Sequence, residues 1–279
     1  MIKVAVTGAS GFLGQHVLNY LNNLPVEVVA ITRSKHINLP KLVNGLWVEL
    51  DIQNPPKNIL LLMGNPDILI HLAWQGLPNY KSLHHFEVEL PIQYGFLSAI
   101  IKEGLRSVVV AGTCFEYGMQ SESLSEKLDT NPSNPYGFAK DCLRKNLEFL
   151  KMQHNFKLTW ARLFYLYGDG QSDTSIYQQL KNSIQNSEPR FNMSKGEQLR
   201  DYLPVEKGAQ YLVDLGLLQK DIGVINVCSG EPISVKNLVE TWLKENNWDI
   251  ELNLGFYSYS EYEPINFWGD SCYLKSFLS

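Results

Sequence analysis

The sequence predicts an α/β protein with a doubly wound parallel sheet, followed by a smaller α/β lobe. Three observations predict this fold class. An apolar strand at residues 2–6 runs directly into a glycine-rich turn and a helix. Strand and helix patterns then alternate through the first half of the chain. Strands such as 106–111, with Val108, Val109 and Val110 in succession, are apolar throughout, as is typical of strands buried on both faces.

Residues 1–162 form the first predicted unit, in which strand and helix patterns alternate repeatedly. Apolar residues at helical spacing define the helices, and Gly104 is a typical residue just after a helix end. The predicted strands are 2–6, 26–31, 47–50, 67–72, 106–111 and 157–162. The predicted helices are 12–21, one beginning at Pro55-Pro56, 84–103 and 136–152, the last after a breaker-rich loop at 131–135.

Residues 163–279 form the second predicted unit, which begins with a polar, irregular stretch at 168–200. Within this unit, segment 203–222 is expected to pack back on the first unit. The predicted helices are 175–185, 204–218 and 234–245, and the predicted strands are 224–227 and 250–254. We expect this lobe to cover the carboxyl edge of the parallel sheet, because ligands of such folds bind there.

Composition excludes several functional classes. The 279 residues carry a formal net charge of −5, with no long lysine–arginine cluster, which argues against a nucleic-acid groove. No apolar run approaches the roughly 18 residues that span a bilayer, and the first residues already read as a core strand rather than a cleaved signal. The cysteines and histidines show no metal-ligand spacing, so no metal site is expected. We expect a cytoplasmic protein that binds neither membranes nor nucleic acid.

Gly8, Gly11 and Gly14 are spaced as a dinucleotide pyrophosphate requires. One glycine makes the tight turn, one lets the backbone approach the phosphates, and one lets the helix pack closely on the strand. The N–H groups at the start of the following helix then face the negative charge. The alternative is a tight strand–helix turn that binds no ligand.

Tyr136 and Lys140 form a Tyr-x-x-x-Lys pair at the start of a predicted helix, so both side chains lie on one helix face. A lysine cation near a tyrosine favours the phenolate, and we expect Lys140 to lower the pKa of Tyr136 toward neutrality. Thr113 lies just past the strand 106–111. It is placed to hydrogen-bond the oxygen of a substrate carbonyl group that the Tyr136 phenol would also contact. The alternatives are an ordinary surface pair and a threonine that binds only its own turn.

Together with further motifs along the chain, these residues resemble the extended short-chain dehydrogenase/reductase family, and within it the nucleotide-sugar branch. The resemblance covers almost the whole chain in the right order. The motifs are Gly8-x-x-Gly11-x-x-Gly14, His71-Leu72-Ala73, Thr113 with Tyr117-Gly118, Tyr136-x-x-x-Lys140, Arg162-Leu163-Phe164 with Tyr167-Gly168, Arg200-Asp201-Tyr202, and Asn226-Val227-Cys228-Ser229-Gly230.

The resemblance implies a Rossmann-type nucleotide lobe, a small substrate lobe and hydride transfer between a nicotinamide and a sugar carbon. It implies that Tyr136 is the acid/base, that Lys140 holds the nicotinamide ribose and that Thr113 steers the reacting oxygen. The cofactor would also contact the residues of the glycine turn and the strand ends, namely Gly8, Ser10, Gly11, Phe12, Leu13, Gly14, Leu72, Ala73 and Trp74. Asp51-Ile52 stands where family members contact adenine, although it could equally be a helix N-cap region.

The second strand indicates which cofactor is bound. It ends in Thr32-Arg33-Ser34, without the carboxylate that would bind the ribose 2′-hydroxyl of NAD. Arg33 could instead pair with a 2′-phosphate, and Thr32 could add a hydrogen bond. We therefore predict NADPH rather than NADH. The alternative is that Arg33 is a solvated surface charge.

Departures from the family pattern bear on the reaction. The 4,6-dehydratases of the branch carry Asp-Glu after the catalytic threonine, whereas this chain has Cys114 and Phe115, which disfavours dehydration. Glu116 either contacts the substrate or is structural. Cys114 and Tyr165 are further candidate substrate contacts, and Arg200 is the candidate partner of the substrate diphosphate because guanidinium pairs with phosphate through two hydrogen bonds.

The residues that occupy these motifs resemble most closely those of the reductases of 4-keto-6-deoxy nucleotide sugars. Such enzymes reduce the C4 keto group of an NDP-4-keto-6-deoxyhexose, here expected to be dTDP-linked, to a 6-deoxyhexose for bacterial surface polysaccharides such as O-antigen. The alternatives are an NAD-dependent 4-epimerase and a non-catalytic nucleotide sensor on the same fold. Relatives pair through their two long helices, so the resemblance also suggests a homodimer through 84–103 and 136–152.

Overall fold

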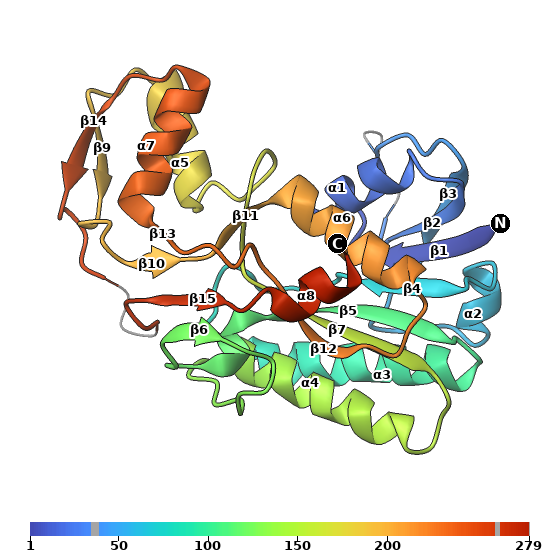
Figure 1. Cartoon of the computed structure of the whole chain (residues 1–279). Helices are drawn as coiled ribbons and strands as arrows, with labels where there is room; N and C mark the ends of the chain where they lie inside the picture. Colours follow the sequence, from blue (N-terminus) through green and yellow to red (C-terminus); the bar gives the residue numbers. More distant parts are fainter. Residues whose placement is uncertain (35–38, 260–262, 279) are drawn as a thin grey trace.

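The protein is described here by a computed structural model, which describes residues 1–34, 39–259 and 263–278 (Figure 1). A seven-stranded parallel sheet organises it, with the strand order β3-β2-β1-β4-β5-β7-β12. The strands are β1 (Ile2–Thr7), β2 (Val26–Thr32), β3 (Gly45–Glu49), β4 (Ile68–His71), β5 (Ser107–Thr113), β7 (Lys157–Leu163) and β12 (Gly223–Val227). The predicted doubly wound parallel sheet is confirmed.

Burial explains why the central strands contain almost only apolar residues. Val108, Val109 and Val110 of β5 are at most 1% exposed, because helices cover both faces of the sheet. On β1, Val4 pairs in register with Val28 on one side and Ile68 on the other. A strand of this kind gains its stability from apolar burial on both faces, at about 25 cal/mol per Å² of apolar surface.

Helices cover the two faces of the sheet in separate layers (Figure 1). One layer contains α1 (Phe12–Leu21), α6 (Val205–Leu217) and the C-terminal α8 (Cys272–Phe277). The other contains α2 (Ile59–Leu62), α3 (Leu90–Lys102), preceded by the π-helical turn η1 (His85–Glu89), and α4 (Pro135–Lys151). The helix expected from Pro55-Pro56 is shorter than predicted, since the chain reaches it through Asn58 in the left-handed conformation at φ 63°.

A smaller lobe lies at the upper left of Figure 1 and has its own core around Trp242, Phe191 and Val239. It contains α5 (Ile176–Gln185) and α7 (Val235–Asn246), the strand pair β9 (Arg190–Met193) and β14 (Glu251–Leu254), and the short pair β10 (Leu199–Arg200) and β13 (Ile233–Ser234). Two further pairs connect it to the large sheet, namely β8 (Tyr165–Tyr167) with β11 (Tyr202–Pro204), and β6 (Glu122–Leu124) with β15 (Phe267–Gly269).

The chain crosses between the lobes more often than a boundary at 162/163 implies. Helix α6 packs against α1 and the sheet, in the segment 203–222 that the sequence places there. Strand β12 also joins the large sheet, beside β7, and α8 packs against β12. The sequence identifies β12 as a strand because Ile225 and Val227 are apolar, but its pairing partner depends on tertiary contacts that a local pattern does not encode.

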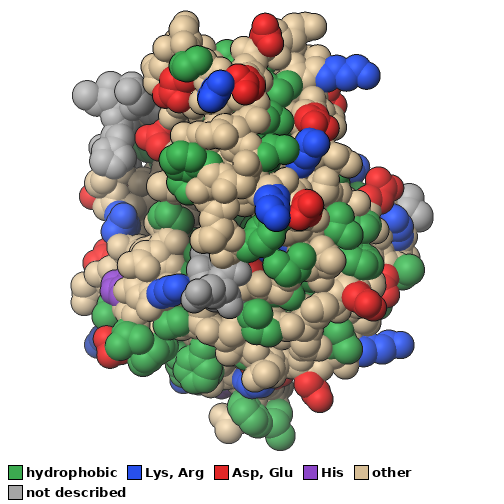
Figure 2. Space-filling view, turned by 90° about the vertical axis from the view of Figure 1, so that its left-hand side faces the viewer, with side chains coloured by type: hydrophobic (Ala, Val, Ile, Leu, Met, Phe, Trp, Pro, Cys, Tyr) green, Lys and Arg blue, Asp and Glu red, His purple; other side chains and the backbone are tan. Residues whose placement is uncertain are grey.

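Side chains of both charges are interspersed over the face shown in Figure 2. Within the described ranges no helix is both long and apolar enough to cross a membrane. Among these residues there is also no group of three or more His, Cys, Asp or Glu side chains that could hold a metal ion.

Candidate active site

The glycine turn brings β1 and α1 into contact as its spacing predicts. Gly8 has φ +68°, and a Cβ there would lie 2.8 Å from the backbone nitrogen of Ala73. A Cβ on Gly14 would overlap the carbonyl oxygen of Gly8. Helix α1 begins after Gly11 without any side-chain cap, so no side chain satisfies its first N–H groups. The turn therefore offers backbone donors and the positive end of a helix to an anion.

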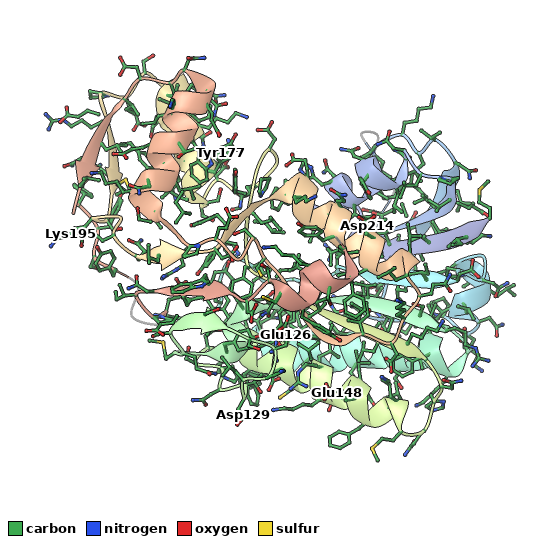
Figure 3. All side chains as sticks on the ribbon, viewed as in Figure 1. Glu126, Asp129, Glu148, Tyr177, Lys195 and Asp214 are labelled. Carbon is green, nitrogen blue, oxygen red and sulfur yellow. The ribbon has the colours of Figure 1, made fainter. Side chains whose placement is uncertain are left out.

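Two cavities meet at this turn. The larger has a volume of about 570 Å³ and extends toward the small lobe, where Tyr177 of α5, labelled in Figure 3, lines it. The smaller, about 240 Å³, lies over the ends of β1 and β2. Both are lined by Gly8, Gly11, Leu72 and Trp74. Because one turn lies between them, the two cavities fit the two halves of a dinucleotide whose pyrophosphate crosses the glycines.

Most of the predicted cofactor residues line one or both cavities. Phe12, Leu13, Gly14 and Lys140 face the larger cavity, while Ser10, Thr32, Arg33, Ile52 and Ala73 face the smaller one. Asp51 lines neither. Its carboxylate accepts hydrogen bonds from Gln53 N at 3.0 Å and Asn54 Nδ2 at 3.1 Å, so it stabilises the turn after β3. The predicted contact of Asp51 with adenine stays a prediction, beside the local turn that its carboxylate stabilises here.

Arg33 is exposed at the rim of the smaller cavity and has no hydrogen bond or ion pair with any described residue. Thr32 is buried, and its hydroxyl donates to Ser34 O at 2.8 Å. Among the described residues that line this cavity there is no carboxylate, and Arg33 is the only charged side chain. The cavity wall thus has the electrostatic character expected for binding a phosphate.

Tyr136 lies in the first turn of α4, which the Asn134 side chain caps by accepting from Gly137 N at 2.8 Å. The helix starts close against the turn that follows β5, since a Cβ on Gly137 would lie 2.6 Å from Phe115 O. The Tyr136 side chain is 8% exposed and lines the larger cavity. Thr113, at the end of β5, lines the same cavity. The structure therefore brings together the two side chains expected to contact the reacting oxygen.

Burial raises the pKa of the Tyr136 phenol well above its ordinary value of 10, and nearby Tyr80, Glu116 and Cys114 add to the rise. Thr113 opposes this rise. The expectation that Lys140 would lower the pKa of Tyr136 is therefore wrong for this structure. The Lys140 nitrogen lies 5.8 Å from the centre of the phenol ring, and desolvation is the largest cause of the raised pKa. Tyr136 is accordingly protonated at neutral pH, which is the form that donates a proton.

Lys140 points from α4 to the end of β5. Its Nζ donates to Ala111 O at 2.8 Å and lies 3.9 Å from the centre of the Trp74 ring. Burial lowers the pKa of Lys140 from 10.5 to about 7, although Glu116 and Glu89 raise it from a distance. The ammonium is therefore lost as pH rises through about 7.

Thr113 and Glu116 form a capping box on the helical turn η2 (Cys114–Tyr117). The Thr113 hydroxyl accepts from Phe115 N at 3.3 Å, and Thr113 N donates to Glu116 Oε1 at 2.9 Å. Glu116 also accepts from Arg162 Nε at 2.7 Å and from the Trp160 indole at 2.9 Å. Glu116 is 0% exposed and lines neither cavity, so its prediction as a substrate contact is corrected to the structural alternative. Cys114 does line the larger cavity, and burial raises the pKa of its thiol, which stays neutral.

Arg200 lies outside the two cavities described above, at a smaller one of about 140 Å³. It is buried, pairs with Glu263 at 2.9 Å and donates to Ile265 O at 2.8 Å. Tyr165 lines both this cavity and the larger one, and its buried hydroxyl has no hydrogen-bonding partner among the described residues. Tyr165 therefore connects the predicted sugar site with the predicted diphosphate site.

Sequence reasoning did not find the aromatic residues that surround Tyr136. The ring of Tyr80 lies 4.9 Å from that of Phe115 and 5.5 Å from that of Tyr136, and His85 lies 5.2 Å from Tyr136. Tyr80 belongs to the connection between β4 and η1, where no periodicity marks it, and His85 is the first residue of η1, near the start of the predicted helix 84–103. Their position after a strand that ends at the ligand edge of the sheet is the one signal that could have found them.

Behind the smaller cavity, a chain of buried hydrogen bonds holds the floor of the site. The Thr7 hydroxyl binds His71 Nδ1 at 2.8 Å, His71 Nε2 binds Gln93 Oε1 at 2.8 Å, and Gln93 Nε2 donates to Glu89 at 2.8 Å. Burial lowers the pKa of His71 to about 3, so its ring is neutral at neutral pH. Glu89 also accepts from Gln75 N at 3.1 Å, which ties down the segment after β4.

Comparisons with known proteins agree with this geometry. The family model described as "NAD dependent epimerase/dehydratase family" matches residues 4–226. A dTDP-6-deoxy-L-talose 4-dehydrogenase (NAD(+)) from Aggregatibacter actinomycetemcomitans is 28% identical over 272 residues, which cover 96% of this chain and 99% of that protein. A dTDP-4-dehydro-6-deoxyglucose reductase from Escherichia coli is 24% identical over 254 residues, covering 85% of this chain and 80% of that protein.

The fold is also shared with a solved structure. UDP-glucuronic acid 4-epimerase from Bacillus cereus, in complex with UDP-glucuronic acid and NAD, superposes with a TM-score of 0.81 at 21% identity, covering 99% of this chain and 93% of that one. The resemblance inferred from the motifs is confirmed. The chain belongs to the NAD dependent epimerase/dehydratase family, the extended short-chain dehydrogenase/reductases that modify nucleotide sugars.

Proposed function

We propose that this protein uses NADPH to reduce the C4 keto group of a dTDP-linked 4-keto-6-deoxyhexose to the corresponding 6-deoxyhexose, for use in surface polysaccharide. One observation carries the proposal. A buried, protonated Tyr136 and Thr113 both line an aromatic cavity at the point where that cavity meets the glycine turn. This arrangement matches the needs of ketone reduction, in which a hydride reaches carbon and a proton reaches oxygen.

Each of the three catalytic residues has a separate task. NADPH held at the glycine turn by Gly8, Gly11 and Gly14 would supply the hydride for C4. Tyr136 donates its proton to the C4 oxygen, and Thr113 hydrogen-bonds that oxygen and holds it against the phenol. Lys140 binds the ribose hydroxyls with the N–H groups that Ala111 does not occupy. A neutral phenol starts the reaction in the direction of reduction, whereas oxidation of an alcohol would need the phenolate.

The walls beside Tyr136 support a 6-deoxy sugar. C4 of a hexose lies between C3, which carries a hydroxyl, and C5, which carries C6. Phe115, Tyr80 and the ring of Tyr165 form an apolar wall close to the phenol, and such a wall fits a C6 methyl better than a hydroxymethyl group. The adjacent Cys114 and Phe115 have no group that can act as an acid or base in eliminating water.

Two arginines are proposed to bind phosphate groups, one on the cofactor and one on the nucleotide sugar. Arg33 supports NADPH, because it is the charged side chain of the smaller cavity and no carboxylate lines that wall among the described residues. Arg200 and Tyr165 support a diphosphate at the junction with the third cavity. The dTDP group is proposed because the A. actinomycetemcomitans and E. coli relatives are named for dTDP sugars.

We also propose a homodimer that pairs through α3 and α4. Phe138, Cys142 and Phe149 recur at helical spacing along α4, and Phe138 and Phe149 are 48% and 69% exposed. Phe86 of η1 packs edge-on against Phe138, with ring centres 6.0 Å apart. Exposed aromatic residues along one face of a long helix are typical of an interface.

A substrate panel tests the reaction. Purified protein is mixed with dTDP-, CDP- and GDP-4-keto-6-deoxyhexoses and with either NADPH or NADH, and cofactor oxidation is followed together with product identity. We expect stoichiometric oxidation of NADPH with the dTDP sugar. Tyr136→Phe should lower kcat by about 10²- to 10⁴-fold, since it removes the proton donor. Arg33→Ala should weaken NADPH binding by about 10- to 100-fold and leave NADH binding unchanged.

Three outcomes would contradict the proposal. Protein that is purified with tightly bound NAD and interconverts C4 epimers without net cofactor oxidation is a 4-epimerase, as the B. cereus protein is named. Protein that binds nucleotides but converts none of the sugars is a sensor. A Tyr136→Phe variant with full turnover would exclude the proposed proton donor.

A further inference from the structure

Trp74 occupies a position that the proposed reaction does not yet explain. It lies in the segment that follows β4 and lines both the larger and the smaller cavity, at their junction. Its ring is a direct neighbour of both catalytic side chains of α4. The Lys140 nitrogen lies 3.9 Å from the ring centre, and the Tyr136 ring packs edge-on with centres 5.9 Å apart.

A hydrogen bond to His85 fixes the indole in this orientation. Trp74 Nε1 donates to His85 Nδ1 at 3.1 Å, and the two rings stack with an interplanar angle of 27°. His85 Nε2 lies 2.8 Å from Asn79 O, which can only accept. His85 must therefore carry its hydrogen on Nε2 and accept on Nδ1. Burial lowers the pKa of His85, which favours this neutral form. The Nε2 bond to Asn79 O fixes the imidazole ring, and Nδ1 of that fixed ring then holds the indole.

The face of the indole is one of only two close partners of the Lys140 ammonium among the residues described. The carbonyl of Ala111 accepts one of its N–H groups, and Trp74 faces it on another side. Glu116 and Glu89 attract the charge from farther away, since their own salt bridges are with Arg162 and His84. His71, His85 and Tyr136 also face Lys140, and all three are neutral at neutral pH. A buried cation without a carboxylate partner is stabilised by contact with an aromatic face.

We propose that Trp74 is a positioning residue, whose indole face holds the Lys140 ammonium charged and aimed into the cleft while His85 locks the indole in place. The proposal rests on the role of Lys140 in the proposed function. It explains why a large aromatic residue stands at the junction of two cavities that a dinucleotide has to share. It also assigns a task to His85, which lies beside Tyr136 and belongs to a segment without other recognised function.

Substitutions of similar size separate the aromatic face from simple filling of space. Trp74→Leu keeps the site apolar but removes the aromatic face, whereas Trp74→Phe keeps one six-membered aromatic face and removes the five-membered ring that carries the N–H group. The measurement is the dissociation constant of NADPH or NADH, whichever binds more tightly, from pH 6 to 9. Because the pKa of Lys140 is about 7, affinity in the wild type should fall as pH rises through that value.

In Trp74→Leu we expect about 3- to 30-fold weaker binding at pH 6.5, and the fall in affinity should begin about half a unit to one unit lower in pH. Trp74→Phe keeps an aromatic face but loses the bond to His85, so it should lose less affinity than Trp74→Leu and keep the pH at which affinity falls. Trp47→Leu is the matched control. Trp47 is a half-buried tryptophan of the same lobe whose Nε1 donates to Pro40 O at 3.0 Å, and it lines neither cavity.

A second pair of variants tests the lock. His85→Phe keeps an aromatic ring but cannot accept the indole N–H, so it should weaken cofactor binding in the wild type. In the Trp74→Phe background the same change should have no further effect, because the N–H group is already gone. Additive effects of the two substitutions would contradict the role given to His85.

Equal losses in Trp74→Leu and Trp74→Phe, or an unchanged pH dependence in Trp74→Leu, would overturn the proposal. If Trp74→Leu does not fold, as judged by circular dichroism, the Trp74→Phe and His85→Phe cycle still decides. These measurements use cofactor binding alone. The binding measurements therefore test the role of Trp74 even if the protein reduces no 4-keto sugar. That second result would refute the proposed function, not the role of Trp74.

Discussion

Glu116 shows how much of the catalytic geometry depends on a residue outside the cavities. Its buried carboxylate accepts from Thr113 N, Trp160 and Arg162, which come from two neighbouring strands of the sheet. By binding the backbone of Thr113 it fixes the threonine that lines the cavity with Tyr136. A buried ion pair of this kind adds little net stability, but removal of one partner leaves a desolvated charge behind.

Glu116→Gln should therefore destabilise the protein by about 3 kcal/mol or more, because Arg162 would lose its only anionic partner among the described residues. The measurement is the free energy of unfolding from urea titration. The control is Glu148→Gln, which removes a half-exposed partner of Arg144 and should cost less than about 1 kcal/mol. Equal losses in the two variants would contradict the structural role of Glu116.

Tyr136 and Lys140 illustrate that burial moves acids and bases in opposite directions. The phenol is made less acidic and the ammonium more acidic, so both favour their neutral forms. The Tyr-x-x-x-Lys spacing predicts that the two side chains share a helix face. It does not reveal how deeply they are buried, because that depends on Trp74, Tyr80 and Phe115 from other parts of the chain.

At the scale of elements, the contact between β1 and α1 depends on Gly14. A Cβ there would overlap Gly8 O, so Gly14→Ala should push α1 away from the strand. We expect a loss of several kcal/mol in the free energy of unfolding and at least tenfold weaker cofactor binding. Gly95→Ala in α3 is the control, because a Cβ there meets nothing within 4 Å. It should stabilise the protein by up to about 1 kcal/mol through helix propensity. If both variants are destabilised alike, crowding at Gly14 is not the cause.

Elements were predictable where the information is local. A few consecutive residues are enough to predict the glycine turn, the buried valines of β5 and the start of α4. The features that were missed depend on distant partners. The sequence left open whether Glu116 contacts the substrate or is structural, because its partner Arg162 lies 46 residues away. The sheet that β12 would join could not be read from five residues.

At the scale of the whole molecule, the proposed dimer places the exposed aromatic face of α4 against a second copy. Light scattering should give twice the chain mass of 31.8 kDa at micromolar concentration. Phe149→Lys should convert the protein to a monomer with unchanged circular dichroism, because a charge at the centre of an apolar contact is costly to bury. Phe256→Lys, an exposed aromatic residue of the small lobe, is the control and should remain dimeric. A wild-type protein of single-chain mass would refute the dimer.

The return of β12 and α8 to the large sheet has a consequence for how this enzyme can be assembled. The small lobe is enclosed within the chain, since segments from both sides of it complete the nucleotide lobe. A fragment that stops at residue 162 would lack an edge strand and the cover that α6 provides for one face. The nucleotide lobe is therefore assembled from segments on both sides of the small lobe, so neither lobe is a continuous N-terminal or C-terminal module.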